Sequence, residues 1–138
     1  MSFMVHPPFT PYVFYEDATA AIAYLSKAFG FRERFPTSTN EDGSVVHAEL
    51  QLGDVVVMLA DGDASDHLTG RYRGPNSLGG VTVGLHVHVD DVDTHFAHAK
   101  AAGATIEHEP QDQTFGARYY RARDPEGHLW WFWSPTPG

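Results

Sequence analysis

The sequence predicts an α+β fold built from two tandem βαβββ modules, and three observations lead to this prediction. A strand, a helix and three strand-like runs follow one another in residues 9–60, and the same order returns in residues 81–135. Strands in both halves have one apolar and one polar face, which is typical of an antiparallel or mixed sheet covered by helices on one side. Residues 61–80 are loop-like throughout and connect the halves. We therefore expect a single domain over residues 1–138.

The first module begins with a short strand and an amphipathic helix. The strand is expected at Thr10–Tyr15, and the helix runs from about Ala18 to Phe29 because apolar residues recur there at helical spacing. Asp17 is a suitable N-cap and Gly30 a suitable end. The strand-like runs that follow are Glu33–Phe35, Val45–Leu52 and Val55–Ala60, the last two joined by the hairpin pair Gly53-Asp54.

The second module repeats this order with different residues. A strand at "GLHVHV" precedes a helix that Asp90 or Asp91 caps and Gly103 ends. The runs "TIEHE", "ARYYRAR" and "HLWWFW" follow as strands. The last two are joined by Asp124-Pro125-Glu126-Gly127, whose residue types suit a type I turn.

Two strands show clearly which residues face the helices. In one the apolar set is Leu85, Val87 and Val89, against Gly84, His86 and His88; in the other it is Val46, Ala48, Leu50 and Leu52, against His47, Glu49 and Gln51. Because side chains alternate along a strand, we expect the apolar sets to pack on the helices and the second sets to face a cavity.

Composition excludes several classes of function. Nine basic against eighteen acidic residues give a net charge of -9, which argues against a nucleic-acid or anionic-membrane partner. The absence of cysteine excludes disulfides, thiolate catalysis and cysteine-ligated metals. The sequence shows neither a signal peptide nor an apolar segment of about 20 residues, so we expect a cytoplasmic protein.

The duplicated βαβββ unit, the "DPEGH" turn before the last strand and the "FGF" that closes the first helix resemble the vicinal oxygen chelate superfamily. This superfamily includes glyoxalase I, bleomycin-resistance proteins and extradiol dioxygenases. The resemblance implies a cupped mixed sheet around a ligand cavity and a homodimer. It also places Tyr12, Phe14, Val56, Met58, Tyr119, Arg121, Trp131 and Trp133 on the concave face, with Trp130 and Phe132 packed under the helices.

Metal-dependent members of the superfamily hold a divalent ion at four equivalent strand positions. In this sequence these positions fall on Thr10, Met58, Gly84 and Trp131. None of the four side chains is a plausible ligand for zinc, nickel, iron or manganese, which take imidazole, carboxylate or thiolate. We therefore predict that the shared metal site is absent and that no cofactor is bound.

The sequence favours a metal-free small-molecule binding protein of the bleomycin-resistance type, whose ligand is an aromatic or amphipathic compound such as an antibiotic. An aromatic floor suits such a ligand because stacking adds about 0.5–1.5 kcal/mol beyond area burial. The predicted ligand-binding residues are Tyr12, Phe14, His47, Glu49, Met58, His86, His88, Tyr119, Arg121, Trp131 and Trp133.

Two alternatives stay open at this point. One is a glyoxalase- or dioxygenase-like lyase or oxidoreductase with a relocated metal site, in which His86 and His88 face His47 and Glu49 across the cavity. In the same enzyme class, Glu49 or a histidine would serve as a general base. The other is a cup filled by its own aromatic side chains. Arg121 is expected to pair either with an acidic ligand group or with Glu49, and His128 is expected to be structural.

Overall fold

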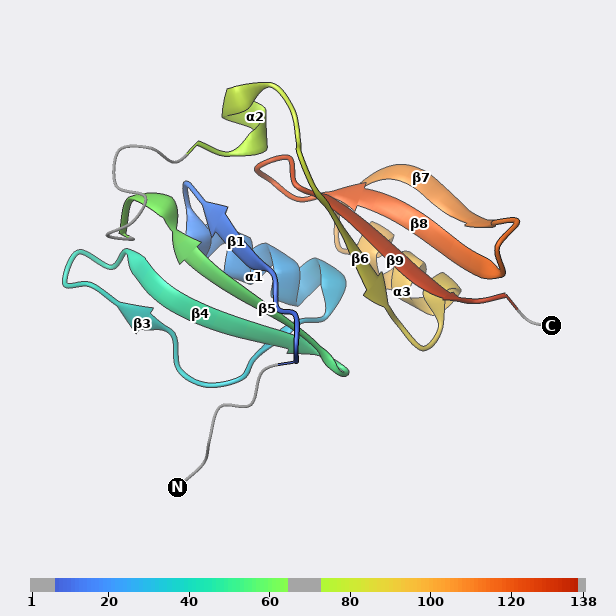
Figure 1. Ribbon diagram of the computed structural model, residues 1–138, viewed down its shortest axis with the longest axis horizontal. Coiled ribbons are helices and arrows are strands. Elements are labelled where there is room, and N and C mark those ends of the chain that lie inside the picture. The colour runs from blue at the N-terminus through green and yellow to red at the C-terminus, as the bar shows by residue number, and fades with distance from the viewer. Residues whose placement is uncertain (1–6, 65–72, 137–138) are drawn as a thin grey trace.

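The two βαβββ-type modules predicted from the sequence are present in the computed structural model, which describes residues 7–64 and 73–136 (Figure 1). The first module contains β1 (Tyr12–Tyr15), α1 (Ala18–Phe29), β2 (Arg32–Glu33), β3 (Ser38–Thr39), β4 (Val45–Leu52) and β5 (Val55–Asp61). The second contains β6 (Gly84–His88), α3 (Val92–Ala101), β7 (Thr105–Asp112), β8 (Ala117–Arg123) and β9 (Leu129–Pro135). Part of the connecting segment, residues 65–72, lies outside the described residues.

The strands form two mixed sheets, one for each module. The first has the order β1-β5-β4-β2, with β3 also paired to β4, and the second has the order β6-β9-β8-β7. In each sheet the first strand of the module pairs in parallel with the last. No backbone pairing joins β1 to β6 within the described residues, so the single cupped sheet expected from the resemblance is replaced there by two sheets that end at these strands. The homodimer stays a prediction.

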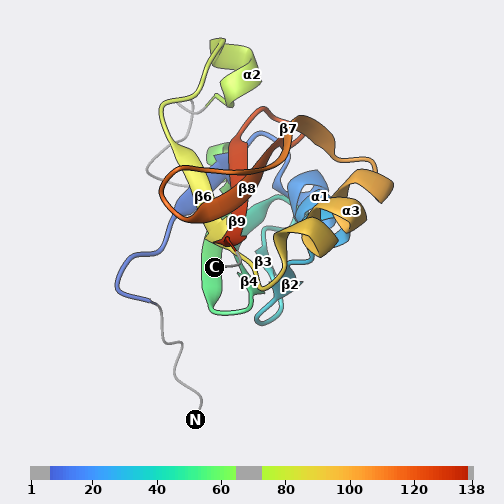
Figure 2. The same cartoon turned by 90° about the vertical axis from the view of Figure 1, so that its right-hand side faces the viewer.

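The helices α1 and α3 cover the same side of the molecule. Figure 2 shows α1 and α3 next to each other on one side of the two sheets. The ends of α1 follow the local sequence: Asp17 Oδ1 accepts a hydrogen bond from the backbone N–H of Ala20, and Gly30 adopts the left-handed conformation (φ 82°) that closes the helix. None of the helices in the described part of the chain is long and apolar enough to span a membrane.

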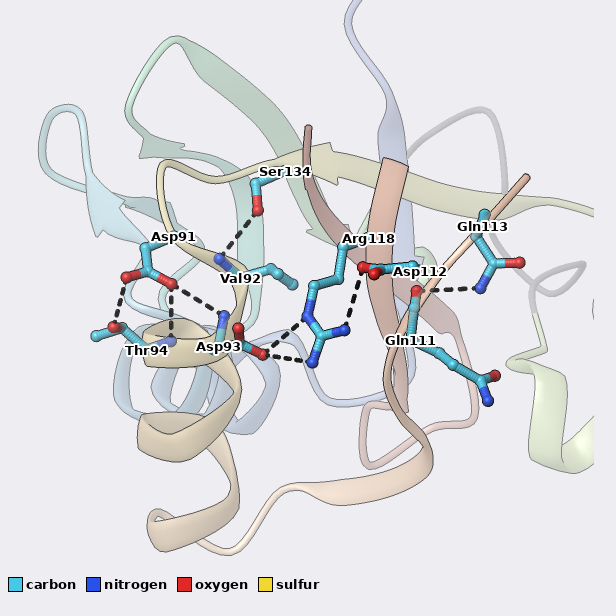
Figure 3. Close-up of polar contacts among 9 residues, drawn as sticks. All are labelled: Asp91, Val92, Asp93, Thr94, Gln111, Asp112, Gln113, Arg118 and Ser134. Carbon is cyan, nitrogen blue, oxygen red and sulfur yellow. Dashed lines mark hydrogen bonds and ion pairs between the residues drawn. The ribbon is translucent and has the colours of Figure 1, made fainter. Parts of the chain in front are cut away.

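Side chains of β8 and β9 contact the start of α3 (Figure 3). Asp91 is its N-cap and accepts hydrogen bonds from the backbone N–H groups of Asp93 and Thr94. The Ser134 hydroxyl on β9 accepts from the backbone N–H of Val92, and Arg118 on β8 pairs with Asp93. These contacts satisfy helix N–H groups that have no partner within the helix.

The two modules share one hydrophobic core. Trp130 and Phe132 are fully buried, as alternation predicted, and both rings contact Phe29 at the end of α1. The buried Asp124 of the "DPEGH" turn links the modules further, because its Oδ2 accepts hydrogen bonds from the Tyr15 hydroxyl (2.6 Å) and from Trp130 Nε1 (3.1 Å). The turn itself closes as predicted, with the backbone N–H of Gly127 bonded to the Asp124 carbonyl.

The connecting segment is more ordered than the sequence indicated. It contains the short helices η1 (Gly62–Ala64) and α2 (Pro75–Leu78). The Glu16 carboxylate accepts hydrogen bonds from the Gly74 backbone and the Ser77 hydroxyl. The Glu126 carboxylate accepts from the backbone N–H groups of Glu16 and Asp17. These contacts, which a local pattern does not reveal, fix α2 beside the start of α1.

Two strand boundaries differ from the sequence prediction because of proline. The first strand begins at Tyr12 and not at Thr10, since Pro11 has no N–H to donate to a sheet. The run predicted at Glu33–Phe35 is two short strands, β2 and β3, and Pro36 lies between them.

Candidate functional site

A cavity of about 850 Å³ lies where the two modules meet. The first module contributes β1 and the start of β5, and the second contributes β6. Residues between 73 and 83, from the end of the connecting segment and the start of the second module, complete the wall. Most of the side chains are apolar or aromatic. Those used below are Phe9, Tyr12, Phe14, Leu78, Val83, Gly84, His86 and His128.

Three of the predicted ligand-binding residues line this cavity. Tyr12 and Phe14 lie on β1, two residues apart, so they share one face, and their rings stack with centroids 4.6 Å apart. His86 lies on β6 and reaches the cavity from the other module. Burial lowers the pKa of His86, so its imidazole is neutral near pH 7.

The polar residues predicted on the first sheet form a hydrogen-bonded chain among themselves. The Tyr12 hydroxyl lies 3.0 Å from His47 Nδ1, and His47 Nε2 lies 2.9 Å from the Glu49 carboxylate. Glu49 is only 3% exposed and pairs with Arg34 at 2.8 Å. Met58 lies between Tyr12 and Glu49 in the strand register. The two carboxylate oxygens of Glu49 contact Arg34 and His47, respectively, and the general-base role that the sequence suggested for Glu49 stays a prediction.

Burial and the nearby Glu49 carboxylate raise the pKa of Tyr12, so the hydroxyl keeps its proton at neutral pH.

Sequence reasoning missed Arg34, because nothing local marks it as the partner of a residue on another strand. Arg121 pairs with Glu107 at 3.0 Å, so the suggested pairing of Arg121 with Glu49 was wrong.

The predicted residues of the second sheet surround Trp133. His86 stacks on its indole with centroids 5.6 Å apart, and His88 meets it edge-on at 4.9 Å. Tyr119 is opposite Trp133 in the register of β8 and β9 and also contacts His86 edge-on. These side chains form an aromatic face on β6, β8 and β9, and of the group only His86 also lines the cavity.

Trp131 packs against the strand beside it. A Cβ added to Gly84 on β6 would lie 2.3 Å from Cζ3 of the Trp131 indole, so the ring occupies the space that a side chain at position 84 would need. The Arg121 guanidinium lies over the same indole, 5.6 Å from its centroid. Trp131 therefore faces away from the buried Trp130 and Phe132, as alternation predicted, but it contacts this chain's own backbone.

The four positions that correspond to metal ligands do not fit a divalent ion. Thr10, Met58, Gly84 and Trp131 offer neither imidazole nor carboxylate, and the indole of Trp131 leaves no room for a longer side chain at Gly84. The relocated site that His47, Glu49, His86 and His88 suggested does not form either. Within residues 7–64 and 73–136, no group of three or more His, Asp or Glu side chains is placed to hold a metal ion.

His128, which the sequence indicated as structural, also lines the cavity. Its Nε2 lies 3.2 Å from the backbone carbonyl of Phe14, so the side chain does connect the modules. In the sequence, only its place directly after the Asp124–Gly127 turn indicated that His128 has a structural role.

A second cavity, of about 620 Å³, lies between the tip of the β4–β5 hairpin and the start of α3, and His88 lines it.

Comparison with known proteins gives the family. Residues 7–132 match the Glyoxalase/Bleomycin resistance protein/Dioxygenase superfamily. The chain therefore belongs to this superfamily. The uncharacterized protein Mb0911c of Mycobacterium bovis is 39% identical over 138 residues, which cover 99% of this chain and 88% of the relative.

Solved structures show the same fold. TioX from Micromonospora sp. ML1 has a TM-score of 0.72 and 34% identity, covering 96% of this chain and all of TioX. A glyoxalase/bleomycin resistance protein/dioxygenase from Nocardioides has a TM-score of 0.68 and 20% identity, covering 98% of this chain and 88% of that protein. The second likeness supports the fold alone.

Proposed function

We propose that this protein binds a flat, largely apolar small molecule in the cavity between its modules and that it does so without a metal ion. The observation that carries the proposal is the cavity itself, whose volume of about 850 Å³ lies within the range of small-molecule sites. Its wall is mainly apolar, and the stacked rings of Tyr12 and Phe14 stand on one side. An antibiotic with a flat aromatic core belongs to this class of ligand.

The chemistry of the strand positions supports binding by contact and shape. Where metal-dependent relatives would place imidazole or carboxylate ligands, this chain has Thr10, Met58, Gly84 and Trp131. Aromatic rings recognise flat ligands by stacking, which contributes about 0.5–1.5 kcal/mol per pair beyond the burial of apolar area. The aromatic face around Trp133 then supports the β6 side of the cavity, because His86 belongs to both.

A matched pair of exposed phenylalanines provides the test. Phe9 is 84% exposed and lines the cavity, whereas Phe115 is 68% exposed and does not. Titration calorimetry with 2-methoxynaphthalene, a neutral flat probe, should show binding to the wild-type protein. Phe9→Ala should weaken this binding about two- to tenfold through loss of an aromatic contact, and Phe115→Ala should leave it unchanged.

The two variants should unfold at the same temperature as the wild type, because neither ring is part of the core. Absence of binding to the wild-type protein would contradict the proposed function. Equal losses in Phe9→Ala and Phe115→Ala would place the ligand elsewhere and would also contradict it.

A further inference from the structure

The polar side chains that line the cavity are Tyr12, Asp54, Arg73, Thr82, His86 and His128. Two of them, His86 and His128, are imidazoles from the second module. His128 is held in one orientation by three contacts. Its Nε2 lies 3.2 Å from the Phe14 carbonyl, its ring meets Tyr15 edge-on with centroids 4.7 Å apart, and its backbone N–H donates to Asp124 at 3.1 Å. Its ring is therefore held against the first module, while its backbone belongs to the turn of the second.

The contact with Phe14 determines which nitrogen of His128 carries the hydrogen. A carbonyl oxygen only accepts, so Nε2 must be the N–H that donates to it. In a neutral imidazole the other nitrogen then carries a lone pair and only accepts. In the part of the chain that the structure describes, no group donates to His128 Nδ1. His128 lines the cavity and is half-buried, and its Nδ1 keeps some accessible surface.

We infer that the ligand carries an O–H or N–H group on its flat apolar body, as phenols and aromatic amides do, and that this group donates a hydrogen bond to His128 Nδ1. This inference rests on the proposed function and names the class of compound within it. His128 is then the residue that determines specificity. A compound whose polar end only accepts would place a lone pair against that of Nδ1 and leave both unsatisfied.

Two probes that differ in a single hydrogen-bond donor test the inference. 2-Naphthol has a hydroxyl where 2-methoxynaphthalene has a methyl ether. Titration calorimetry at about pH 7.5, above the usual pKa of an imidazole, should show 2-naphthol binding about three- to tenfold more tightly. The additional methyl group of the ether would by itself favour the ether, so the expected order cannot come from apolar burial. Equal binding, or tighter binding of the ether, would overturn the inference while leaving the proposed function intact.

Two variants then locate the acceptor. His128→Phe keeps an aromatic ring against Tyr15 but removes both nitrogens, so the ratio of the two affinities should fall to about one. His86→Phe is the matched control, because it removes the other imidazole of the cavity and should keep the wild-type ratio. A ratio that survives in His128→Phe would rule out His128 as the acceptor.

Spectroscopy of the wild-type protein covers the case in which His128→Phe does not fold. Long-range ¹H–¹⁵N spectra should show a hydrogen on His128 Nε2, the nitrogen that faces the Phe14 carbonyl. The Nδ1 resonance should move when 2-naphthol is added and much less with the ether. An Nδ1 resonance that stays in place while 2-naphthol binds would overturn the inference.

Discussion

Gly84 and Trp131 show how one residue fixes the position of another across two paired strands. The indole lies so close to the Gly84 backbone that a Cβ there would approach Cζ3 to 2.3 Å. The Arg121 guanidinium covers the ring, and Glu107 pairs with both Arg121 and Arg123. The absence of a side chain at position 84 is therefore a packing requirement of Trp131.

Gly84→Ala should displace the indole and lower the free energy of unfolding by about 1–3 kcal/mol, the usual cost of overpacking. Gly80→Ala is the matched control, because a Cβ at Gly80 would meet nothing within 4 Å. Urea denaturation and the tryptophan emission maximum measure the two effects. An emission maximum that is the same in Gly84→Ala as in the wild type would mean that the ring does not depend on the glycine.

At the scale of secondary-structure elements, α3 is joined to α1 through histidine side chains. His95 Nε2 donates to the carbonyl of Phe29 at 2.8 Å, and the Tyr120 hydroxyl donates to His95 Nδ1 at 2.6 Å. His98 Nε2 lies 2.9 Å from the carbonyl of Lys27. Two of the last carbonyls of α1, those of Lys27 and Phe29, are thus satisfied by side chains of another helix.

Burial lowers the pKa of His95 below its usual value of about 6.5 in an unfolded chain. The unfolded state therefore binds the proton more readily, and the free energy of unfolding should fall as the pH drops below about 6.5. His95→Gln cannot take up a proton, so its stability should depend less steeply on pH between about 5 and 7. Urea denaturation of both proteins at several pH values gives the two slopes, and identical slopes would contradict the prediction.

The elements that the sequence predicted well are those whose causes are local. Asp17 and Gly30 determine the ends of α1, and alternation separates the buried Trp130 and Phe132 from the outward-facing Trp131. The arrangement of the site depends on partners far apart in the sequence. The Arg34–Glu49 pair, the position of α2 and the place of His128 in the cavity each come from such contacts, so the spacing of residues does not indicate them.

At the scale of the whole molecule, the two modules are held together by a shared core and by the buried carboxylate of Asp124. All three tryptophans lie in the second module, whereas Tyr15, which donates to Asp124, belongs to the first. Tryptophan fluorescence therefore reports on one module, and a change at Tyr15 begins in the other. We expect the modules to unfold in a single transition.

Tyr15→Phe should lower the free energy of unfolding by about 1.5–3 kcal/mol, because a buried hydrogen bond to a charged group is lost. Tryptophan fluorescence and far-ultraviolet circular dichroism should shift together. Tyr12→Phe, which removes a more exposed hydroxyl, should cost about 0.5 kcal/mol or less. Two separate unfolding transitions would show that the modules unfold independently. A fluorescence transition that is the same in Tyr15→Phe as in the wild type would show it too.

The strands on either side of the cavity belong to different sheets, and in the described residues no backbone hydrogen bond crosses from β1 to β6. If the gap widens by a small amount, each sheet keeps its own ladder and only side-chain contacts must adjust. The width of the cavity between β1 and β6 is thus determined by side-chain contacts and not by hydrogen bonds between strands. Under the proposed function, such a site would accommodate compounds of different thickness at little cost, and His128 Nδ1 would still accept a hydrogen bond from their polar end.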